Sequence, residues 1–251
     1  MDRYLENIEH KAAVLCDALP YIRDFVHKVI VIEYDCGEWL SGVEEKKLIK
    51  DIVLLKSIGV IPIVVHRTQM GVDKFRENKR IAKLLELCDT KAIGICGVDI
   101  ETIQMMIKND YIPVIVPNDI DNEMENIDPR DTALEVAVRM KADKLIYLSR
   151  YPGIYTDDTR SDVYPRITVH EVEELKKTRH FQPDFMDYLQ HCIDAVNQGV
   201  NRAHILDGRI EHVLPIEFFS IDGAGTVLIK DEKTLYQHEL YFYGDTYVNR
   251  S

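Results

Sequence analysis

The stretch KVIVIEYDCG, residues 28–37, decides how this chain folds. Its apolar run from Val29 to Ile32 is rich in β-branched residues and is followed by Glu33 and a polar loop, the pattern of a buried parallel strand that ends in a tight turn. In open α/β sheets, ligands bind at the carboxyl ends of such strands. A phosphate site there would need glycines and a cation, whereas this loop carries Glu33, Asp35 and a single glycine. The two carboxylates would repel a phosphate.

Helix and strand patterns alternate along the rest of the chain. Residues 44–58 place apolar side chains on one face and end at Gly59, which predicts a helix, and the apolar run 60–66 predicts the next strand. Together with the first strand they predict a right-handed β-α-β unit whose strands are parallel. Further helices are predicted at residues 73–87, 101–108, 132–140, 170–177, 185–198 and 211–219, and further strands at 91–96, 111–116, 144–149, 203–206 and 227–229. We therefore expect an α/β fold around a mainly parallel sheet, with the polar stretch 118–126 as a hinge between two halves.

The composition limits the kinds of partner. A formal net charge of -12 argues against binding to nucleic acid or to an anionic membrane, because both reward clusters of Lys and Arg. Small molecules and proteins are the expected partners. The five cysteines are an odd number without a CxxC pair, which indicates reduced thiols and no zinc site. The first residues are charged where a signal peptide is apolar, and no apolar run approaches the ~18 residues of a membrane span, so we expect a cytoplasmic protein.

Both ends of the chain carry patterns that suggest contacts. Apolar residues from Leu5 to Ile22 repeat at alternating steps of three and four, which predicts a helix with one apolar stripe. Pro20 predicts a kink near Leu19, with residues 21–25 as a second, short helical segment. Two interpretations of the stripe remain open, a helix packed on its own domain and a contact with another subunit. The tail from Tyr236 is rich in aromatic residues, so we expect it to pack on the body or on a neighbour.

Several segments together resemble the N-acetylglutamate kinase branch of the amino acid kinase family. They follow that family's order and spacing over nearly the whole chain to about Lys230, and they are Ala18–Arg23, Lys50–Lys56, Pro113–Ile115, Lys144–Ile146 and His204–Arg209. The resemblance implies a three-layer αβα sandwich. It also implies a kinked N-terminal helix for oligomerisation in residues 1–25, a lobe of the amino-acid-binding type in 26–118, and a lobe of the nucleotide-binding type with the aromatic tail in 119–251.

Members of this family use ATP to phosphorylate the side-chain carboxylate of acetylglutamate, a reaction that depends on positioning and charge neutralisation. Where the family has a catalytic Lys at the end of the first strand, this chain has Glu33, and Asp35 follows where the family has glycine. The family's His and three glycines after the second strand correspond to His66 and three residues with side chains. The arginine that clamps the substrate aligns with Cys96, and the interval from residue 66 to residue 91 is shorter than its family counterpart, so a substrate-covering hairpin is expected to be missing.

The second half departs from the family in the same sense. The Asp that orients both catalytic lysines aligns with Arg130, although a shifted register would use Asp131. The nucleotide-side Asp aligns with Arg150, a degenerate cofactor-binding position, and the second catalytic Lys aligns with Tyr188. Because Glu33 stands where the family has a cation and Arg130 where it has an anion, we predict that Glu33 pairs with Arg130 or Arg150.

These departures predict a protein that has lost the family's reaction. Removing one preorganised charge costs ~10²–10³ in rate, and several are changed together. The leading hypothesis is a catalytically degenerate, ligand-binding, regulatory or scaffolding homo-oligomer that needs no cofactor. One alternative is an enzyme with reassigned chemistry in the same cleft, using Glu33, Asp35, His66, Arg67, Arg130 and Tyr188. The other is an acetylglutamate kinase that uses ATP and Mg with reassigned lysines.

One region keeps the family pattern. Residues 212–219 and 223–226 resemble the effector site of arginine-inhibited members, which lies beside a kinked N-terminal helix that links dimers into a hexameric ring. The candidate effector-binding residues are His212, Glu217, Gly223 and Gly225, with Glu217 pairing to a guanidinium or ammonium group. The simpler interpretation is a solvated Glu217 and glycines that only turn the chain. The expected partner is a second copy, in a dimer or a hexamer, with an amino acid as a possible small-molecule ligand.

Three other features receive simpler interpretations. His66 at a strand end suits an acid or base, but a lone His is more often a structural residue. Asp157, Asp158 and Asp162 lie in a polar loop that we interpret as a solvated acidic turn rather than a cation site, so no metal is expected. Cys36 is a poor nucleophile because its acidic neighbours would raise its pKa.

Overall fold

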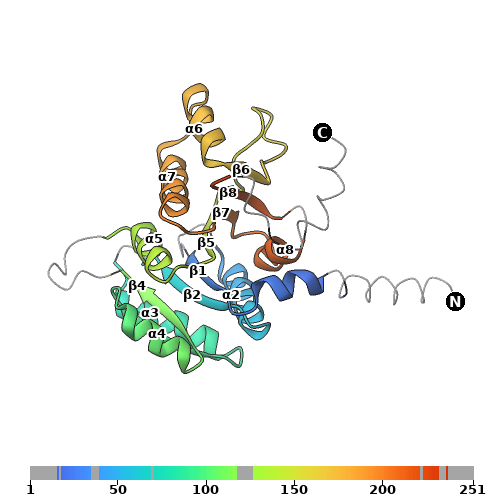
Figure 1. The fold of residues 1–251 in the computed structure, drawn as a ribbon. Helices are drawn as coiled ribbons and strands as arrows, with labels where there is room; N and C mark the ends of the chain where they lie inside the picture. Colours follow the sequence, from blue (N-terminus) through green and yellow to red (C-terminus); the bar gives the residue numbers. More distant parts are fainter. Residues whose placement is uncertain are drawn as a thin grey trace.

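The computed structural model describes residues 16, 18–34, 40–68, 71–117, 127–220, 223–231 and 236 of the chain. These residues form helices on both sides of one eight-stranded sheet (Figure 1). The amino half contributes β1(Val29–Tyr34), α2(Gly42–Ser57), β2(Ile61–His66), α3(Lys74–Glu86), β3(Lys91–Cys96), α4(Ile100–Lys108) and β4(Tyr111–Val116). The carboxyl half contributes α5(Pro129–Arg139), β5(Lys144–Ser149), β6(Arg166–Thr168), α6(Val169–Thr178), α7(Pro183–Asn197), β7(Arg202–Asp207), α8(Val213–Phe219) and β8(Gly225–Ile229).

The sheet joins the two halves at its centre. Its strand order is β3-β4-β2-β1-β5-β7-β8-β6, and every pair is parallel except β7 with β8. The predicted mainly parallel α/β sheet is therefore confirmed. Because β1 and β5 pair directly, the carboxyl ends of the central strands of both halves lie at one edge of the sheet.

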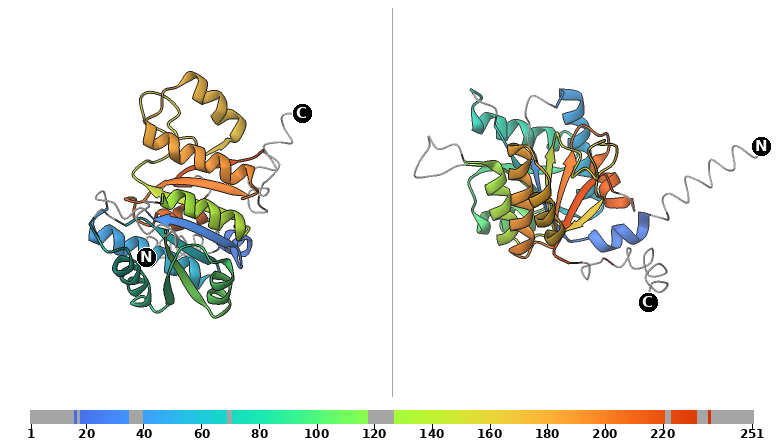
Figure 2. Two further views of the ribbon diagram at one scale, coloured as in Figure 1. Left: turned by 90° about the vertical axis from the view of Figure 1, so that its left-hand side faces the viewer. Right: turned by 90° about the horizontal axis from the view of Figure 1, so that it is seen from above.

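Helices cover both faces of the sheet, which gives the expected three layers. Figures 1 and 2 show α5 and α7 on one side of the sheet and α2 and α8 on the other. Side chains alternate between these layers, so Val31, Val65 and Tyr147 belong to the core under α5 and α7. Ile32 and Ile146 belong to the second core, under α2, α3 and α8. A residue's position along a strand thus decides which helices it meets.

The first strand is longer than the sequence indicated. We expected it to end at Ile32, but β1 continues through Glu33 and Tyr34, and both are buried. The reason is the central place of β1, because Glu33 stands in register with Val65 of β2 on one side and Tyr147 of β5 on the other. Two flanking ladders extend a strand beyond its apolar run.

Helix starts follow the local sequence. Ser41 and Glu44 form a reciprocal cap at α2, and Thr168 and Glu171 do the same at α6. Helix α8 begins two residues later than predicted, because His212 before it has a left-handed backbone with φ 60°. The short strand β6 was not predicted, since three residues carry no recognisable alternation.

Some predictions fall outside the described residues. They include most of the N-terminal stripe, Asp35 and Cys36, the hinge 118–126, and the tail apart from Tyr236. Residues 18–25 form one helical run through Pro20, so residues 21–25 are not the separate segment that we predicted. Within the described ranges, no helix is both long and apolar enough to cross a membrane.

Candidate functional site

Six charged side chains meet near the carboxyl ends of β2 and β5. We call them the Arg130 cluster, and they are Arg67, Asp128, Arg130, Arg150, Asp184 and Asp187. Two of the arginines directly follow strands β2 and β5, and the remaining members lie at the amino ends of α5 and α7. Asp128 caps α5 by accepting a hydrogen bond from the Arg130 backbone N–H at 2.9 Å. This local cap holds Asp128 and Arg130 side by side.

Arg130 is the centre of this cluster, and its side chain is only 8% exposed. Its Nη2 and Nε atoms donate to Asp128 at 2.6 and 3.1 Å, and its Nη1 donates to Asp184 Oδ1 at 3.3 Å. Nη2 also lies 3.8 Å from Asp187 Oδ2. The guanidinium carbon lies 4.8 Å from the centre of the Tyr188 ring. A planar guanidinium can donate along its edge while its face stacks on a ring, so Arg130 is held on both sides.

Glu33 lies in the same layer as Arg130 and Tyr188. Its strand neighbour Tyr147 meets the Tyr188 ring at 5.7 Å, in an edge-to-face arrangement, and donates its hydroxyl to the Arg130 carbonyl at 3.4 Å. Burial raises the pKa of Tyr147 well above its ordinary value, and nearby Cys192 and Glu33 act in the same direction. The structure therefore brings the aligned positions Glu33, Arg130 and Tyr188 together.

The ion pair that we predicted between Glu33 and Arg130 or Arg150 is not formed in the described structure. Arg130 pairs with the aspartates described above, and Arg150 Nη2 lies 3.7 Å from Asp184 Oδ2. Arg130 pairs with these carboxylates because Asp128 is only two residues away in the chain and because α7, which carries Asp184 and Asp187, packs directly against α5.

Asp131 shows which residue of α5 faces this layer. Its Oδ1 lies 2.8 Å from His191 Nε2 of α7, and its side chain is 65% exposed. Arg130 is the buried one of the two and stacks on Tyr188. Arg130, and not Asp131, is therefore the residue of this pair that lies beside Tyr188.

Two arginines keep Asp128 ionised. Burial alone would raise the pKa of this carboxyl, but the hydrogen bonds and charge of Arg130 and the charge of Arg67, 3.6 Å away, hold it below its ordinary value. Three aspartates and three arginines thus face each other in the cluster. The positive charge of the arginines is already compensated by protein carboxylates.

His66 does not join this group, because its side chain lies on the opposite face of the sheet. It stands in register with Tyr34, and its Nε2 lies 3.2 Å from Asn78 Oδ1 of α3. Its Nδ1 lies 3.1 Å from the Arg67 carbonyl. Burial lowers the pKa of His66. The cleft that we expected between Glu33 and His66 is thus divided by the sheet, and His66 has the hydrogen bonds of a structural histidine.

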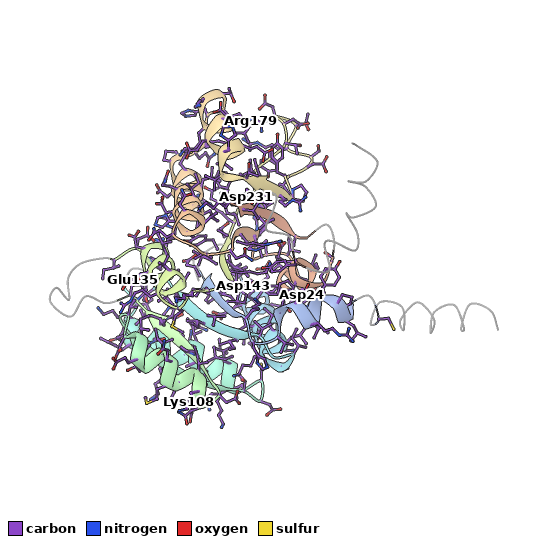
Figure 3. The ribbon with its side chains drawn as sticks, viewed as in Figure 1. Asp24, Lys108, Glu135, Asp143, Arg179 and Asp231 are labelled. Carbon is purple, nitrogen blue, oxygen red and sulfur yellow. The ribbon has the colours of Figure 1, made fainter. Side chains whose placement is uncertain are left out.

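Arg150 lines a cavity of about 890 Å³, which we call the Arg150 cavity. It opens beside the carboxyl ends of β5 and β7, where Arg150 and Asp207 lie. Its outer wall is the hairpin of residues 154–164, closed by a 2.8 Å hydrogen bond from the Tyr164 N–H to the Ile154 carbonyl. Figure 3 shows Arg179, another lining residue, far out in the carboxyl half. The position aligned with the family's nucleotide-side Asp therefore faces open space.

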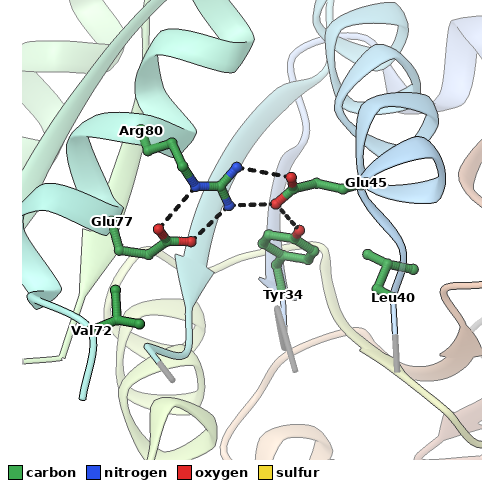
Figure 4. A pocket seen from close by; sticks show the side chains of 7 residues that line it. Tyr34, Leu40, Glu45, Val72, Glu77 and Arg80 are labelled. Carbon is green, nitrogen blue, oxygen red and sulfur yellow. Dashed lines mark hydrogen bonds and ion pairs between the residues drawn. The ribbon is translucent and has the colours of Figure 1, made fainter. Parts of the chain in front are cut away.

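A smaller cavity of about 260 Å³ lies in the amino half, between the starts of α2 and α3 (Figure 4). Arg80 fills one side of it and donates to both Glu45 and Glu77 at 2.6 to 2.9 Å. The Tyr34 hydroxyl donates to Glu45 Oε1 at 2.6 Å. Because these groups bind one another, the cavity wall is a satisfied network that joins α2 to α3 and β1.

The candidate effector residue Glu217 is buried rather than solvated, which overturns the simpler interpretation. Its side chain is 8% exposed and its Oε1 lies 2.8 Å from His204 Nδ1. His204 Nε2 lies 3.2 Å from Lys144 Nζ, and Lys144 is surrounded by the rings of Phe25, Phe218 and Tyr236 at 4.9 to 5.2 Å. Burial, followed by the charge of Lys144, lowers the pKa of His204 to about 4. A neutral His204 therefore links an ammonium group to the Glu217 carboxylate.

Both effector-region glycines are required by close contacts. A Cβ on Gly223 would lie 2.8 Å from Glu217 Oε2, and one on Gly225 would lie 2.3 Å from the Ile205 carbonyl. The Ala224 N–H between them donates to Glu217 Oε2 at 2.8 Å. His212 lies apart from this group and places Nδ1 2.9 Å from Asp51 Oδ1. The structure therefore joins Gly223, Gly225 and Glu217, whereas His212 faces α2.

The acidic loop binds its own backbone. Asp157 accepts hydrogen bonds from the Thr159 N–H and hydroxyl, and the Ser161 hydroxyl donates to Asp162. Across the described ranges, no group of three or more metal-ligating side chains is placed to hold an ion.

Comparisons with known proteins agree with this architecture. The model of the family described as "Amino acid kinase family" matches residues 77–207, just over half of the chain. The chain belongs to the amino acid kinase family. Among individual proteins of the family, the acetylglutamate kinase of Brachyspira hyodysenteriae is 30% identical over 288 residues, covering 90% of this chain and 100% of that protein. The acetylglutamate kinase of Syntrophomonas wolfei is 31% identical over 280 residues, covering 88% and 98%.

Solved structures share the amino acid kinase fold at lower identity. The N-acetylglutamate synthase of Neisseria gonorrhoeae superposes with a TM-score of 0.74 at 21% identity, covering 88% of this chain and 63% of that one. The carbamate kinase of Giardia gives a TM-score of 0.64 at 13% identity, covering 82% and 99%. These likenesses support the fold and no more.

Sequence reasoning missed the carboxylates that surround Arg130. Asp128 carries a local signal, because an Asp directly before Pro129 is a helix cap. Asp184 follows Pro183 at the start of α7 in the same way, but nothing local pairs it with a residue 54 positions away. Lys144 and His204 were noticed only as family landmarks, although buried polar residues at the start of two neighbouring strands are a reason to look for a partner.

Proposed function

We propose that this member of the amino acid kinase family has lost phosphoryl transfer to acetylglutamate and acts as a ligand-binding, regulatory or scaffolding homo-oligomer. The observation that carries the proposal is the Arg130 cluster. At the positions where the family has an Asp on α5 and a Lys on α7, this chain has Arg130 and Tyr188, with Asp184 and Asp187 beside them. The charges of the two helices are exchanged.

This exchange is unfavourable for a transferring phosphoryl group. Such a group carries negative charge that preorganised cations must neutralise. Arg130 is committed to three carboxylates, and Arg67 and Arg150 each lie within 3.7 Å of an aspartate. Glu33 adds a further carboxyl group in the same layer. A phosphate entering here would have to displace protein carboxylates from their arginines.

Gaps in the alignment with a relative support the same proposal. The 288 positions aligned with the Brachyspira hyodysenteriae kinase include 90% of 251 residues, about 226, so roughly 60 positions of that kinase have no counterpart here. The short connection from β2 to α3, residues 67–73, is consistent with loss of the substrate-covering hairpin predicted from the sequence. A chain without this cover would leave an acyl amino acid exposed to water.

Ligand binding is proposed for the effector region. The ligand class is an amino acid with a guanidinium or ammonium group, and the residues are Glu217, Gly223 and Gly225, with His212 at the margin. Because Glu217 already receives hydrogen bonds from His204 and the Ala224 N–H, a ligand cation would have to displace His204. Assembly through the N-terminal helix into a dimer or hexamer, in the cytoplasm and without a cofactor, completes the proposal.

A second candidate is an acetylglutamate kinase with reassigned cations that uses ATP and Mg. It is favoured by the names of the relatives, which are acetylglutamate kinases at about 30% identity over most of the chain. Reassigned chemistry that combines Glu33 with His66 is disfavoured, because the two side chains lie on opposite faces of the sheet.

A turnover assay separates the two candidates. The purified chain is incubated with ATP, Mg²⁺ and acetylglutamate, and ADP release is followed beside the Syntrophomonas wolfei kinase as a positive control. We expect a rate at least ~10⁴-fold below the control, from the loss of two or more preorganised charges. Ordinary turnover of ~1–10³ s⁻¹ would refute the proposal and establish the kinase.

A further inference from the structure

We propose that the amino ends of β5 and β7 form a binding site for a phenol ring, and that Tyr236 fills this site as a latch over the buried Lys144. Tyr236 lies beyond Lys230, where the segments that resemble the family end. We call the place the Tyr236 site, and it consists of Phe25, Asp143, Lys144 and Arg202. That the latch also controls access to the effector region rests on the proposed function, whereas the site itself does not.

The Tyr236 site lies at the edge of the sheet opposite the Arg130 cluster. Lys144 begins β5 and Arg202 begins β7, and the two residues stand in register. Asp143 directly precedes β5, and Phe25 is the last residue of the helical run 18–25. Tyr236 therefore meets the N-terminal helical run and two central strands at once.

Two buried cations face the Tyr236 ring. The Arg202 guanidinium carbon lies 3.8 Å from the ring centre, and Lys144 Nζ lies 5.1 Å from it. Arg202 is only 4% exposed and Lys144 only 2%. A cation is attracted to the face of an aromatic ring, and the attraction grows when water is excluded. The Phe25 ring meets Tyr236 edge-on, with the ring centres 5.2 Å apart. Tyr236 thus supplies the ring face that neighbouring cations require.

The hydroxyl of Tyr236 makes the site selective for a phenol. It donates to Asp143 Oδ2 at 2.5 Å and accepts from Asn201 Nδ2 at 3.4 Å. The Asp143 side chain is only 10% exposed. Burial, followed by the charge of Asp143, raises the pKa of Tyr236 well above its ordinary value, so the hydroxyl stays a donor. A ring without a hydroxyl would leave the Asp143 carboxylate short of one hydrogen bond.

Tyr236 is the wall of the Lys144 environment that can move most easily. The other two rings around Lys144 belong to Phe25 and Phe218, which are buried in helical segments. Tyr236 is partly exposed and lies outside any helix or strand. Its departure would open one side of Lys144 to solvent without unfolding a helix. The hydrogen bonds that continue from Lys144 to Glu217 would then become accessible.

Thermal unfolding of the full chain with p-cresol, which is the free side chain of tyrosine, tests the site. Tyr236→Ala should lower the unfolding midpoint by about 5 °C or more, because it empties the space of a ring. p-Cresol should raise the midpoint of this variant as its concentration increases, since it binds only the folded chain. Toluene at equal concentration should raise it less, because toluene lacks the hydroxyl that Asp143 accepts from.

Tyr111→Ala is the matched control for p-cresol. Tyr111 also stacks with a lysine, with Lys91 Nζ 5.7 Å from its ring centre, but it begins β4 in the amino half. p-Cresol should leave the midpoint of this variant unchanged. A similar increase in both variants would show that p-cresol acts elsewhere and would overturn the proposal.

Lysine acetylation followed by mass spectrometry tests the closure. In the parent, Lys144 should react at least about tenfold more slowly than Lys83, whose side chain is 65% exposed. Tyr236→Ala should accelerate the reaction of Lys144, and p-cresol should slow it again, whereas the rate at Lys83 should stay constant. Equal rates at Lys144 in the parent and in Tyr236→Ala would overturn the latch.

Tyr236→Phe keeps the proposal testable if Tyr236→Ala does not fold. It keeps the ring and loses the hydroxyl, so the midpoint should fall by about 2–4 °C while Lys144 stays protected. An unchanged midpoint, or a Tyr236→Ala midpoint equal to that of the parent, would overturn the proposal. Calorimetric titration of arginine into Tyr236→Ala bears on the proposed function alone, because p-cresol rescue without arginine binding would keep the latch and remove that ligand.

Discussion

The Arg130 guanidinium carbon lies 4.8 Å from the centre of the Tyr188 ring, across the interface between α5 and α7. Resemblance to acetylglutamate kinases aligns these positions with an Asp and a Lys of the reaction centre. Here the same two positions form a cation and aromatic stack that Asp128, Asp184 and Asp187 surround. In this chain the contact between the two side chains joins the two helices.

Arg130→Ala should destabilise the fold by about 2–3 kcal/mol, because it leaves Asp128 partly buried without its main partner and removes the face that packs on Tyr188. Arg130→Lys should have a free energy of unfolding between those of the parent and Arg130→Ala, since an ammonium group keeps the charge but neither donates in the bidentate geometry of a guanidinium nor stacks on a ring. Urea unfolding measures both. Arg139→Ala is the control, because its pair with Glu135 is half exposed, and it should change stability by less than about 0.5 kcal/mol.

A double-mutant cycle tests the coupling between the two helices. Tyr188→Lys alone should destabilise the chain, because it places a second cation beside Arg130. Combining it with Arg130→Asp should recover part of the loss, with a coupling free energy of about 1–3 kcal/mol. Strictly additive effects would show that the helices do not interact through these side chains.

Gly225→Ala should prevent folding or cost more than about 3 kcal/mol, because its Cβ would lie 2.3 Å from the Ile205 carbonyl and 2.7 Å from Leu206 Cδ2. Gly42→Ala is the matched control, since no atom lies within 4 Å of a Cβ at the start of α2. Thermal unfolding should show the control at or slightly above the parent midpoint. A stable Gly225→Ala protein would contradict the close approach of β8 to β7.

Stability should fall as the pH drops from about 6.5 towards 4, in part because of His204. The folded-state pKa of His204 is about 4, below the ordinary 6.5, since burial and the charge of Lys144 oppose protonation and Glu217 only partly offsets them. Between these values the unfolded chain binds more protons than the folded one, so its population grows. Arg202 of β7 acts in the same direction as Lys144.

The variant His204→Gln separates this contribution from the others. His66 has a lowered pKa as well, so the parent slope contains both histidines. Urea unfolding at several pH values should give a shallower slope for the variant between pH 6.5 and 4. An unchanged slope would mean that His204 does not resist protonation in the folded state.

The alternation of elements was predictable because it is a local property. The strands at residues 91–96, 111–116 and 144–149 have the predicted bounds, since each apolar run is closed by polar or turn-forming residues. The end of β1 was not predictable, because Glu33 and Tyr34 become strand residues only through their pairing with β2 and β5.

The candidate site was predictable only as a set of positions. Alignment indicated that Glu33, Arg130 and Tyr188 would meet, and the structure places them in one layer. The alignment did not show that His66 belongs to the other layer. That depends on the register of β1 with β2, which places His66 beside Tyr34 and not beside Glu33. The predicted ion pair of Arg130 with Glu33 was also wrong, because the partners of Arg130 depend on how α7 lies against α5.

The sequence by itself determined that this chain is an αβα sandwich of the amino acid kinase family, because periodicity and residue identity are written along the chain. Only the tertiary structure decided where those charges go. It turned Arg130 towards the aspartates of α7 and buried Glu217 against His204 and Lys144. Ion pairs form between groups that packing brings within a few ångströms, and packing joins residues that lie far apart in the chain.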